Sequence, residues 1–154
     1  YGELLKDLWS KIGVNIKLNP NTWPQFDKKI KNKEATMFDM AWDADYPDAE
    51  NFMQLFYSKN ISPGSNNFNY VNRAYDELYE KALALEPGEG RNQLLRQMVD
   101  IINEDVPGVF IVHRIFRLTY HGWLENFYEY PIIHDHLQYY LVDQDKKEKM
   151  IKNL

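Results

Sequence analysis

Apolar residues recur at helical spacing at the start of the chain. The spacing of the apolar residues from Leu4 to Ile12 predicts a helix that ends at Gly13. Residues 14–18 then alternate apolar with polar side chains, which is typical of a strand. The chain therefore passes directly from a helix to a strand.

A second helix and a second strand follow. Asn21 or Thr22 can cap a helix that has Pro24 in its first turn, and residues 37–42 then read as another strand. The order helix, strand, helix, strand favours a largely parallel sheet covered by helices. The predicted fold class is therefore α/β.

The middle of the chain predicts helices separated by polar loops. Pro47 opens a short helix that ends at Phe56. The stretch 58–69 is rich in Asn, Ser, Pro and Gly and reads as an exposed loop. Apolar stripes over residues 75–85 and 94–102 predict two longer helices, which we expect to pack as an antiparallel pair.

The last third of the chain is richer in aromatic and strand-like sequence. Residues 109–112 are apolar at consecutive positions, which predicts a strand buried on both faces. Residues 116–142 are aromatic without a clear period. Residues 143–154 form a Lys-rich end that can be a helix or disordered.

Length, charge and composition exclude several classes of protein. The 154 residues suffice for one core. The formal net charge of -5 argues against a protein that mainly binds nucleic acid, because such proteins need clustered Lys and Arg. No apolar run approaches the roughly 18 residues that cross a bilayer. The absence of Cys excludes disulfides and cysteine nucleophiles from these residues. Apolar residues at helical spacing begin at the first residues, so we expect the chain to begin inside a structural unit.

The stretch from Trp42 to Asp48 carries the most specific chemistry. It brings an aromatic ring and closely spaced carboxylates to a strand-to-helix junction, where open α/β sheets place ligands. Strand alternation puts Asp43 and Asp45 on one side and Trp42 and Ala44 on the other. A carboxylate in a cleft can bind an ammonium group. A carboxylate at a helix start can also be a cap, an alternative that stays open for Asp45 and is favoured for Asp48.

This stretch, with others that follow it, resembles the family 5 extracellular solute-binding proteins, which include oligopeptide- and dipeptide-binding receptors. The resemblance covers roughly residues 1–125 and is carried by residues 42–52, 64–67, 70–82, 91 and 103–107. It implies a periplasmic-binding-protein-like type II lobe, with a mixed, mostly parallel sheet flanked by helices, as an incomplete fragment.

The resemblance also implies how the chain is divided. Residues 1–115 would form part of the C-terminal ligand-binding lobe. Residues 116–154 would be a return segment that joins the other lobe in the full-length protein. Without that lobe, exposed aromatic strands invite association between copies, so self-association through residues 116–142 is one expectation for the fragment.

In peptide-binding members of the family, an Asp that matches Asp45 anchors the amino terminus of the peptide, and a Trp that matches Trp42 lines the same pocket. Peptides held like an added β-strand also bind through main-chain groups, so the main chain at Asp43 and Ala44 becomes a candidate ligand contact. This pattern implies a receptor for a peptide with a free α-amine.

Three further residues are weaker candidates for ligand binding. Asn66 and Asn67 can offer amide groups to a ligand, although a turn-forming loop is the favoured explanation for them. His113 lies where the predicted buried strand ends, near a pocket-facing position of the family. A structural histidine explains His113 equally well.

The resemblance implies a substrate-binding component of an ABC importer rather than an enzyme, without a cofactor or a metal. Its two lobes would close over an oligopeptide or dipeptide and deliver it to a membrane permease. Such a receptor works outside the cytoplasm, in the periplasm or lipid-anchored at the cell surface in its full-length form. A receptor of the same family for nickel, an oligosaccharide or another solute is the first alternative.

Two alternatives come from other classes of protein. A metal-dependent hydrolase could use His134 and His136 as a metal pair, or Asp45 with Glu50 as acid and base, but the sequence points to no third metal ligand. A helical interaction module could present residues 75–102 to a partner, but their apolar stripes are explained by a core.

Overall fold

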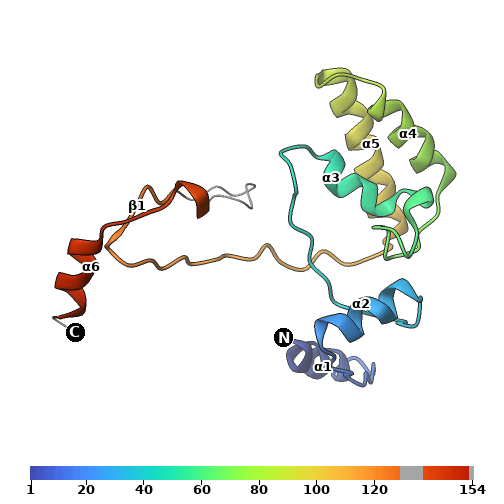
Figure 1. Ribbon diagram of the computed structural model, residues 1–154. Coiled ribbons are helices and arrows are strands. Elements are labelled where there is room, and N and C mark those ends of the chain that lie inside the picture. Colours follow the sequence, from blue (N-terminus) through green and yellow to red (C-terminus); the bar gives the residue numbers. More distant parts are fainter. Residues whose placement is uncertain (129–136, 153–154) are drawn as a thin grey trace.

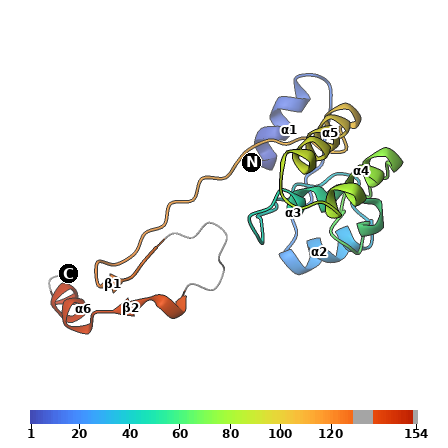
Figure 2. The same cartoon turned by 90° about the horizontal axis from the view of Figure 1, so that it is seen from above.

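A computed structural model describes residues 1–128 and 137–152. A helical region holds the N-terminal two-thirds of the chain, and a small C-terminal unit lies apart from it (Figures 1 and 2). The two are joined by an extended segment that follows the last long helix (Figure 1). The predicted site stretch, residues 42–48, lies within the helical region.

The first two helices confirm the predictions for the start of the chain. Helix α1 (Gly2–Ser10) is followed by Gly13, whose φ of 81° is easily adopted by a residue without a Cβ. Helix α2 (Trp23–Lys31) has Thr22 as its N-cap residue, and the Thr22 N–H donates to Gln25 Oε1 at 3.1 Å. Local capping therefore fixes where α2 starts.

The short helix predicted after Pro47 begins slightly later and changes its winding. Helix α3 (Glu50–Met53) continues as a 3-10 turn, η1 (Gln54–Phe56), and a second turn, η2 (Ser58–Asn60), follows. The loop after η2 is not wholly exposed, because Ser62 and Asn66 are buried. Buried loop groups need internal partners, and Asn66 supplies several of them.

The antiparallel helix pair is confirmed. Helix α4 (Arg73–Leu83) and helix α5 (Glu89–Asp105) lie side by side (Figures 1 and 2). Asn72 caps α4, since its side chain accepts a hydrogen bond from the Tyr75 N–H at 3.1 Å. The break between the helices is short, because α5 already begins at Glu89.

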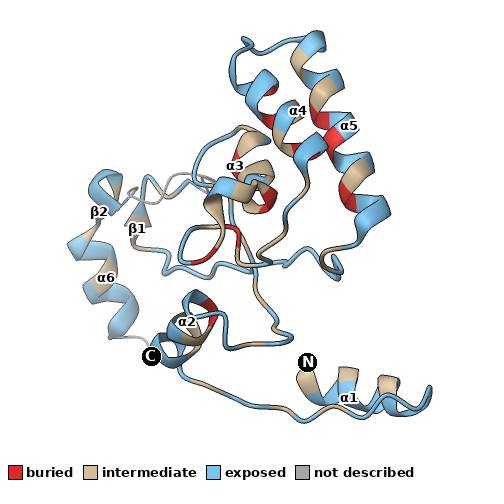
Figure 3. Ribbon diagram, turned by 90° about the vertical axis from the view of Figure 1, so that its right-hand side faces the viewer, coloured by how far each residue is buried: buried red, intermediate tan, exposed pale blue. Residues whose placement is uncertain are grey.

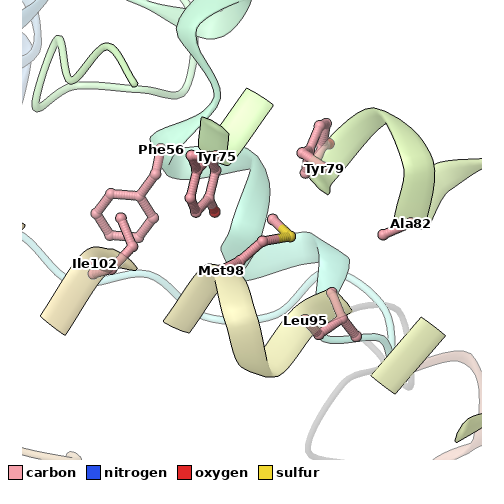
Figure 4. Close-up of a cluster of buried hydrophobic side chains, with 7 residues drawn as sticks. All are labelled: Phe56, Tyr75, Tyr79, Ala82, Leu95, Met98 and Ile102. Carbon is pink, nitrogen blue, oxygen red and sulfur yellow. The ribbon is translucent and has the colours of Figure 1, made fainter. Parts of the chain in front are cut away.

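The main core lies between α4, α5 and η1. Its buried side chains project toward one another from these three elements (Figure 4). Tyr75 and Met98 have no exposed surface, and the Tyr75 hydroxyl donates to the Met53 carbonyl at 2.7 Å. The other members of the cluster are Phe56, Tyr79, Ala82, Leu95 and Ile102. Most buried residues gather around α3, α4 and α5, and another lies on α2 (Figure 3).

The predicted sheet does not form among the described residues. Residues 14–18, 37–42 and 109–112 are not in strands, and the described part has one two-stranded antiparallel sheet of β1 (Leu124–Glu125) and β2 (Leu141–Val142). A strand needs a hydrogen-bonded partner strand, and these three segments do not pair with one another. The mostly parallel sheet implied by the resemblance is therefore not seen here.

The prediction that residues 109–112 are buried on both faces is wrong for this structure. Val109 is 76% exposed and Val112 is 68% exposed, although the Phe110 ring lies 6.2 Å from that of Phe56. The segment leaves α5 through Val106, whose left-handed backbone closes the helix, and Gly108 passes close to Phe68. Among residues 1–128 and 137–152 no strand covers it beyond this point, so its apolar side chains are exposed.

The C-terminal unit consists of β1, β2, a 3-10 turn η3 (Leu137–Tyr139) and helix α6 (Gln144–Ile151). Leu124 pairs with Val142 and Glu125 with Leu141. The Asp143 side chain accepts a hydrogen bond from the Lys146 N–H at 2.9 Å, which starts α6. The Lys-rich end is therefore helical over most of its described length. No helix among the described residues is long and apolar enough to span a membrane.

Candidate functional site

Asn51 organises the predicted site stretch. Its side chain is completely buried at the start of α3. Its Oδ1 accepts hydrogen bonds from the Trp42 indole Nε1 at 2.7 Å and from the Asp45 main-chain N–H at 3.2 Å. Its Nδ2 donates to Asp45 Oδ2 at 3.2 Å. One amide thus fixes the ring, the backbone and the carboxylate of the two leading candidates for ligand binding.

Burial alternates along residues 42–45 as predicted for an extended strand. Trp42 and Ala44 are half-buried, whereas Asp43 and Asp45 are exposed. The two carboxylates therefore share the open side of the segment. The Asp45 side chain bonds to a neighbouring side chain, Asn51, and this contact is not helix capping.

Asp48 has a different, structural role. Its Oδ1 accepts a hydrogen bond from the Glu50 N–H at 2.8 Å, so Asp48 stabilises the start of α3, although the N-cap position itself is Ala49. Its two oxygens also receive Arg91 Nη1 and Nη2 at 2.7 and 2.9 Å, a bidentate pair. The Arg91 guanidinium, with help from the Glu50 N–H, lowers the pKa of the Asp48 carboxyl from its usual value. Arg91 also donates to the Ala82 carbonyl at 3.3 Å, which ties the site stretch to α4 and α5.

Glu50 provides a second connection between the site stretch and the helix pair. Its carboxylate accepts hydrogen bonds from the hydroxyls of Tyr46 and Tyr79. Burial, together with the bond to Glu50, raises the pKa of Tyr79, and the bond to Glu50 raises the pKa of Tyr46. The Glu50 carboxylate is committed to these two hydroxyls, an arrangement that accounts for it without acid–base chemistry.

A pocket lies beside the segment, where Met40, Ala41 and Trp42 contribute to its wall. It has a volume of about 300 Å³, and Trp23, Trp42 and Asn67 are among its lining residues. The structure therefore brings together two of the predicted site residues, Trp42 and Asn67. Asn67 is held there in part by a contact from its Nδ2 to the Met40 sulfur at 3.3 Å. Asp27 and Lys31 of α2 also border the pocket.

Asn66 is a structural residue of its loop. It is completely buried, and its Nδ2 donates to the carbonyls of Tyr57 and Tyr70 at 3.0 and 2.9 Å. Its Oδ1 accepts from the Tyr70 N–H at 3.2 Å. Asn66 therefore stabilises its loop from within, and its side chain is buried instead of exposed to water.

His113 lies apart from the other candidates. It is exposed within the extended segment that follows α5, and this segment leads away from the helical region (Figure 1). The structure therefore does not bring the His113 side chain, a predicted ligand contact, together with Trp42 or Asp45.

The metal-site alternative falls partly outside the described residues, because His134 and His136 are in the stretch 129–136. Within residues 1–128 and 137–152, no group of three or more His, Asp or Glu side chains is arranged to hold a metal ion.

Sequence reasoning missed two residues that matter for the site, Asn51 and Arg91. A buried Asn has no signal in a hydrophobic pattern, and Arg91 stands 43 positions after its partner Asp48. The one available signal was the presence of both residues in stretches that carried the family resemblance.

Comparison with known families finds one matching family. Residues 1–64 match the model of bacterial extracellular solute-binding proteins, family 5 middle. These residues include the whole site stretch from Trp42 to Asp48. The chain is related to the family 5 solute-binding proteins. The predicted resemblance is thereby confirmed.

Three relatives of the chain are binding proteins by name. The di/tripeptide-binding protein 1 of Pseudomonas aeruginosa is 27% identical over 140 residues, covering 84% of this chain and 26% of that protein. The dipeptide-binding protein of Escherichia coli is 27% identical over 72% of this chain and 21% of its own length. The heme-binding protein A of Haemophilus influenzae is 34% identical over 73% of this chain and 21% of its own length.

The chain spans about a quarter or less of these relatives. No solved structure matches it significantly. The family is one of extracellular solute-binding proteins, so its members are binding proteins that work outside the cytoplasm. The relation to this family implies a periplasmic-binding-protein-like fold, and the described residues are mainly helical.

Proposed function

We propose that the full-length protein is the substrate-binding component of an ABC importer, which captures oligopeptides or dipeptides between two lobes and delivers them to a membrane permease. The named peptide-binding relatives support a peptide as the ligand. The single observation that carries the proposal is the exposed Asp45 carboxylate, which bonds to the same Asn51 amide as the Trp42 indole.

The chemistry of this arrangement suits a free α-amine. The Asp45 carboxylate is exposed, so an ammonium group can reach it, and a charge-assisted hydrogen bond between them is stronger than a neutral one. The pocket lined by Trp42 and Asn67 offers a neighbouring space for an apolar part of the ligand. Main-chain groups at Asp43 and Ala44 are proposed to hold the peptide backbone.

The remaining candidates have smaller roles in this proposal. Asn66 shapes the loop that carries Asn67, and does so with a buried side chain. His113 is proposed as a contact only in the closed, full-length receptor. Residues 1–115 are proposed as part of the ligand-binding lobe and residues 116–154 as the return segment to the other lobe.

The proposed setting is the outside of the cytoplasmic membrane, in the periplasm or, with a lipid anchor, at the cell surface. For the isolated chain we propose self-association through residues 116–142. The exposed side chains of Phe116, Leu118 and Tyr120 support this, because unpaired apolar segments favour pairing.

Calorimetry with the full-length protein and trialanine tests the amine anchor. We expect Asp45→Ala to weaken binding by about 100-fold or more, because the peptide ammonium loses its partner, which costs roughly 2–5 kcal/mol. Asp39→Ala removes another exposed carboxylate from the same segment and is the matched control, with a change of less than about threefold. Unchanged affinity in the Asp45 variant would refute the anchor.

A non-peptide solute is the second candidate, and the relationship to a heme-binding protein favours it. Native mass spectrometry of the full-length protein separates the two candidates. Co-purified peptides would support the first, and a co-purified heme or other solute, with no binding of trialanine, would support the second.

A further inference from the structure

We propose that Asn51 is the positioning residue that sets the preference for a free amino terminus. It acts through Asp45 and Trp42 and does not touch the ligand. The inference rests on the proposed peptide-binding function. It assigns control of the specificity of the site to Asn51, a residue outside the predicted site.

The geometry of the amide carries this inference. Asn51 has no exposed surface, yet its Oδ1 and Nδ2 make three hydrogen bonds to the site stretch, at 2.7, 3.2 and 3.2 Å. An amide has one acceptor oxygen and one donor nitrogen, and here each is used on a different part of the site. No apolar residue of the same size can supply both.

Fixing Asp45 in place matters because its side chain is exposed. An exposed aspartate rotates freely and loses this freedom when it binds an ammonium group. The bond from Asn51 Nδ2 to Asp45 Oδ2 restricts that rotation before any ligand arrives. The bond uses only Oδ2 of this exposed carboxylate, so Oδ1 can accept a hydrogen bond from a ligand.

The bond to Trp42 is a second constraint on the site, imposed by the same Asn51 side-chain amide. The indole Nε1 and the Asp45 N–H converge on Asn51 Oδ1, so the ring and the carboxylate keep a fixed separation. A ligand that contacts both the Asp45 carboxylate and the Trp42 ring must have a fixed distance between its amine and its apolar part. Preorganisation of this kind adds to specificity more than to overall affinity.

Asn51 is itself held rigidly by its surroundings. It lies in α3 next to Glu50, whose carboxylate accepts from Tyr79 of α4, and close to Asp48, which pairs with Arg91 of α5. The frame that positions the amide is therefore anchored in the core of the helical region.

The test measures discrimination instead of affinity. Calorimetry with the full-length protein gives the affinity for trialanine and for N-acetyl-trialanine, and the ratio of the two reports the preference for a free amine. We expect Asn51→Ala and Asn51→Ser to lower this ratio by about tenfold, which corresponds to about 1.4 kcal/mol. In an Asp45→Ala background the same substitutions should not change the ratio.

Two matched variants guard against loss of folding. Asn72→Ala removes the helix cap of α4 and should lower the melting temperature while leaving the ratio unchanged. Trp42→Phe keeps a ring but removes the indole donor to Asn51, and should fold and lower the ratio by about two- to threefold. A ratio within twofold of the wild type in every folded Asn51 variant overturns the inference. If no Asn51 variant folds, an unchanged ratio in Trp42→Phe overturns it.

The outcome for the wild-type protein separates this inference from the proposed function. If the wild type binds neither peptide, the peptide-receptor proposal fails. If it binds trialanine with a strong preference that survives the Asn51 substitutions, only the positioning role fails.

Discussion

Residues 50–105 and residues 109–120 both carry many apolar side chains, but only the first region buries them. In the first region, α4 and α5 make their own backbone hydrogen bonds and then bury their apolar stripes against each other and η1. In the second region the backbone is extended, and Ile115 is 90% exposed. The difference shows that a helix can bury its apolar stripe against a helix nearby in the sequence, whereas a strand needs hydrogen bonds to a partner strand.

Met98→Ala should have the largest effect on the first region. Met98 is completely buried in the centre of the core cluster, so truncation removes packing and leaves a cavity. We expect the free energy of unfolding to fall by about 2–5 kcal/mol. Chemical denaturation followed by circular dichroism measures it, and Val99→Ala, at an exposed position next to it, is the control. Equal losses in the two variants would contradict the assignment of the core.

Breaking the Asp48–Arg91 pair should have an intermediate effect. Asp48→Asn keeps the shape of the side chain but removes the charge that receives both guanidinium nitrogens. We expect a loss of about 2 kcal/mol in the free energy of unfolding, because a partly buried, charge-assisted contact is weakened. Glu77→Gln, which breaks the exposed pair between Arg73 and Glu77, is the matched control and should cost less than about 0.5 kcal/mol.

The same pair predicts a pH dependence. The folded-state pKa of Asp48 is lowered, so its contribution is fully present above the unfolded value of about 4 and is lost as the pH falls through the folded pKa. Unfolding curves measured from pH 7 down to pH 2 should therefore show the wild type approaching Asp48→Asn in stability. A stability gap that stays constant over this range would speak against the ion pair.

Phe116→Ser should have the smallest effect on folding. The side chain is 64% exposed in the extended segment, so we expect the free energy of unfolding to change by less than about 0.5 kcal/mol. Sedimentation velocity on the same variant tests the proposed self-association, which this substitution should weaken. A large loss of stability would mean that the extended segment packs more tightly than the structure shows.

The helices could be predicted from the sequence because their information is local. The stripes of α4 and α5, the capping position of Thr22 and the stop at Gly13 are all encoded within a few residues. The strands could not, because an apolar run such as residues 109–112 specifies a preference for burial and not the partner that provides it.

The site shows the same division between local and distant information. The alternation of residues 42–45 and the hydrogen bond of Asp48 to the first residue of α3 followed from neighbouring residues and are seen in the structure. The buried amide of Asn51 and the reach of Arg91 depend on how α3, α4 and α5 meet, which no local pattern records. The role of Asp45 as an amine anchor stays a prediction until binding is measured.

The bonds from Arg91 to Asp48 and from Tyr79 to Glu50 make the stretch around Asp45 mechanically continuous with α4 and α5. Such a stretch cannot swing like a flap on its own; any displacement must carry the two helices along. Release of a bound ligand would then require the stretch around Asp45 to move together with α4 and α5, and not the opening of a single loop.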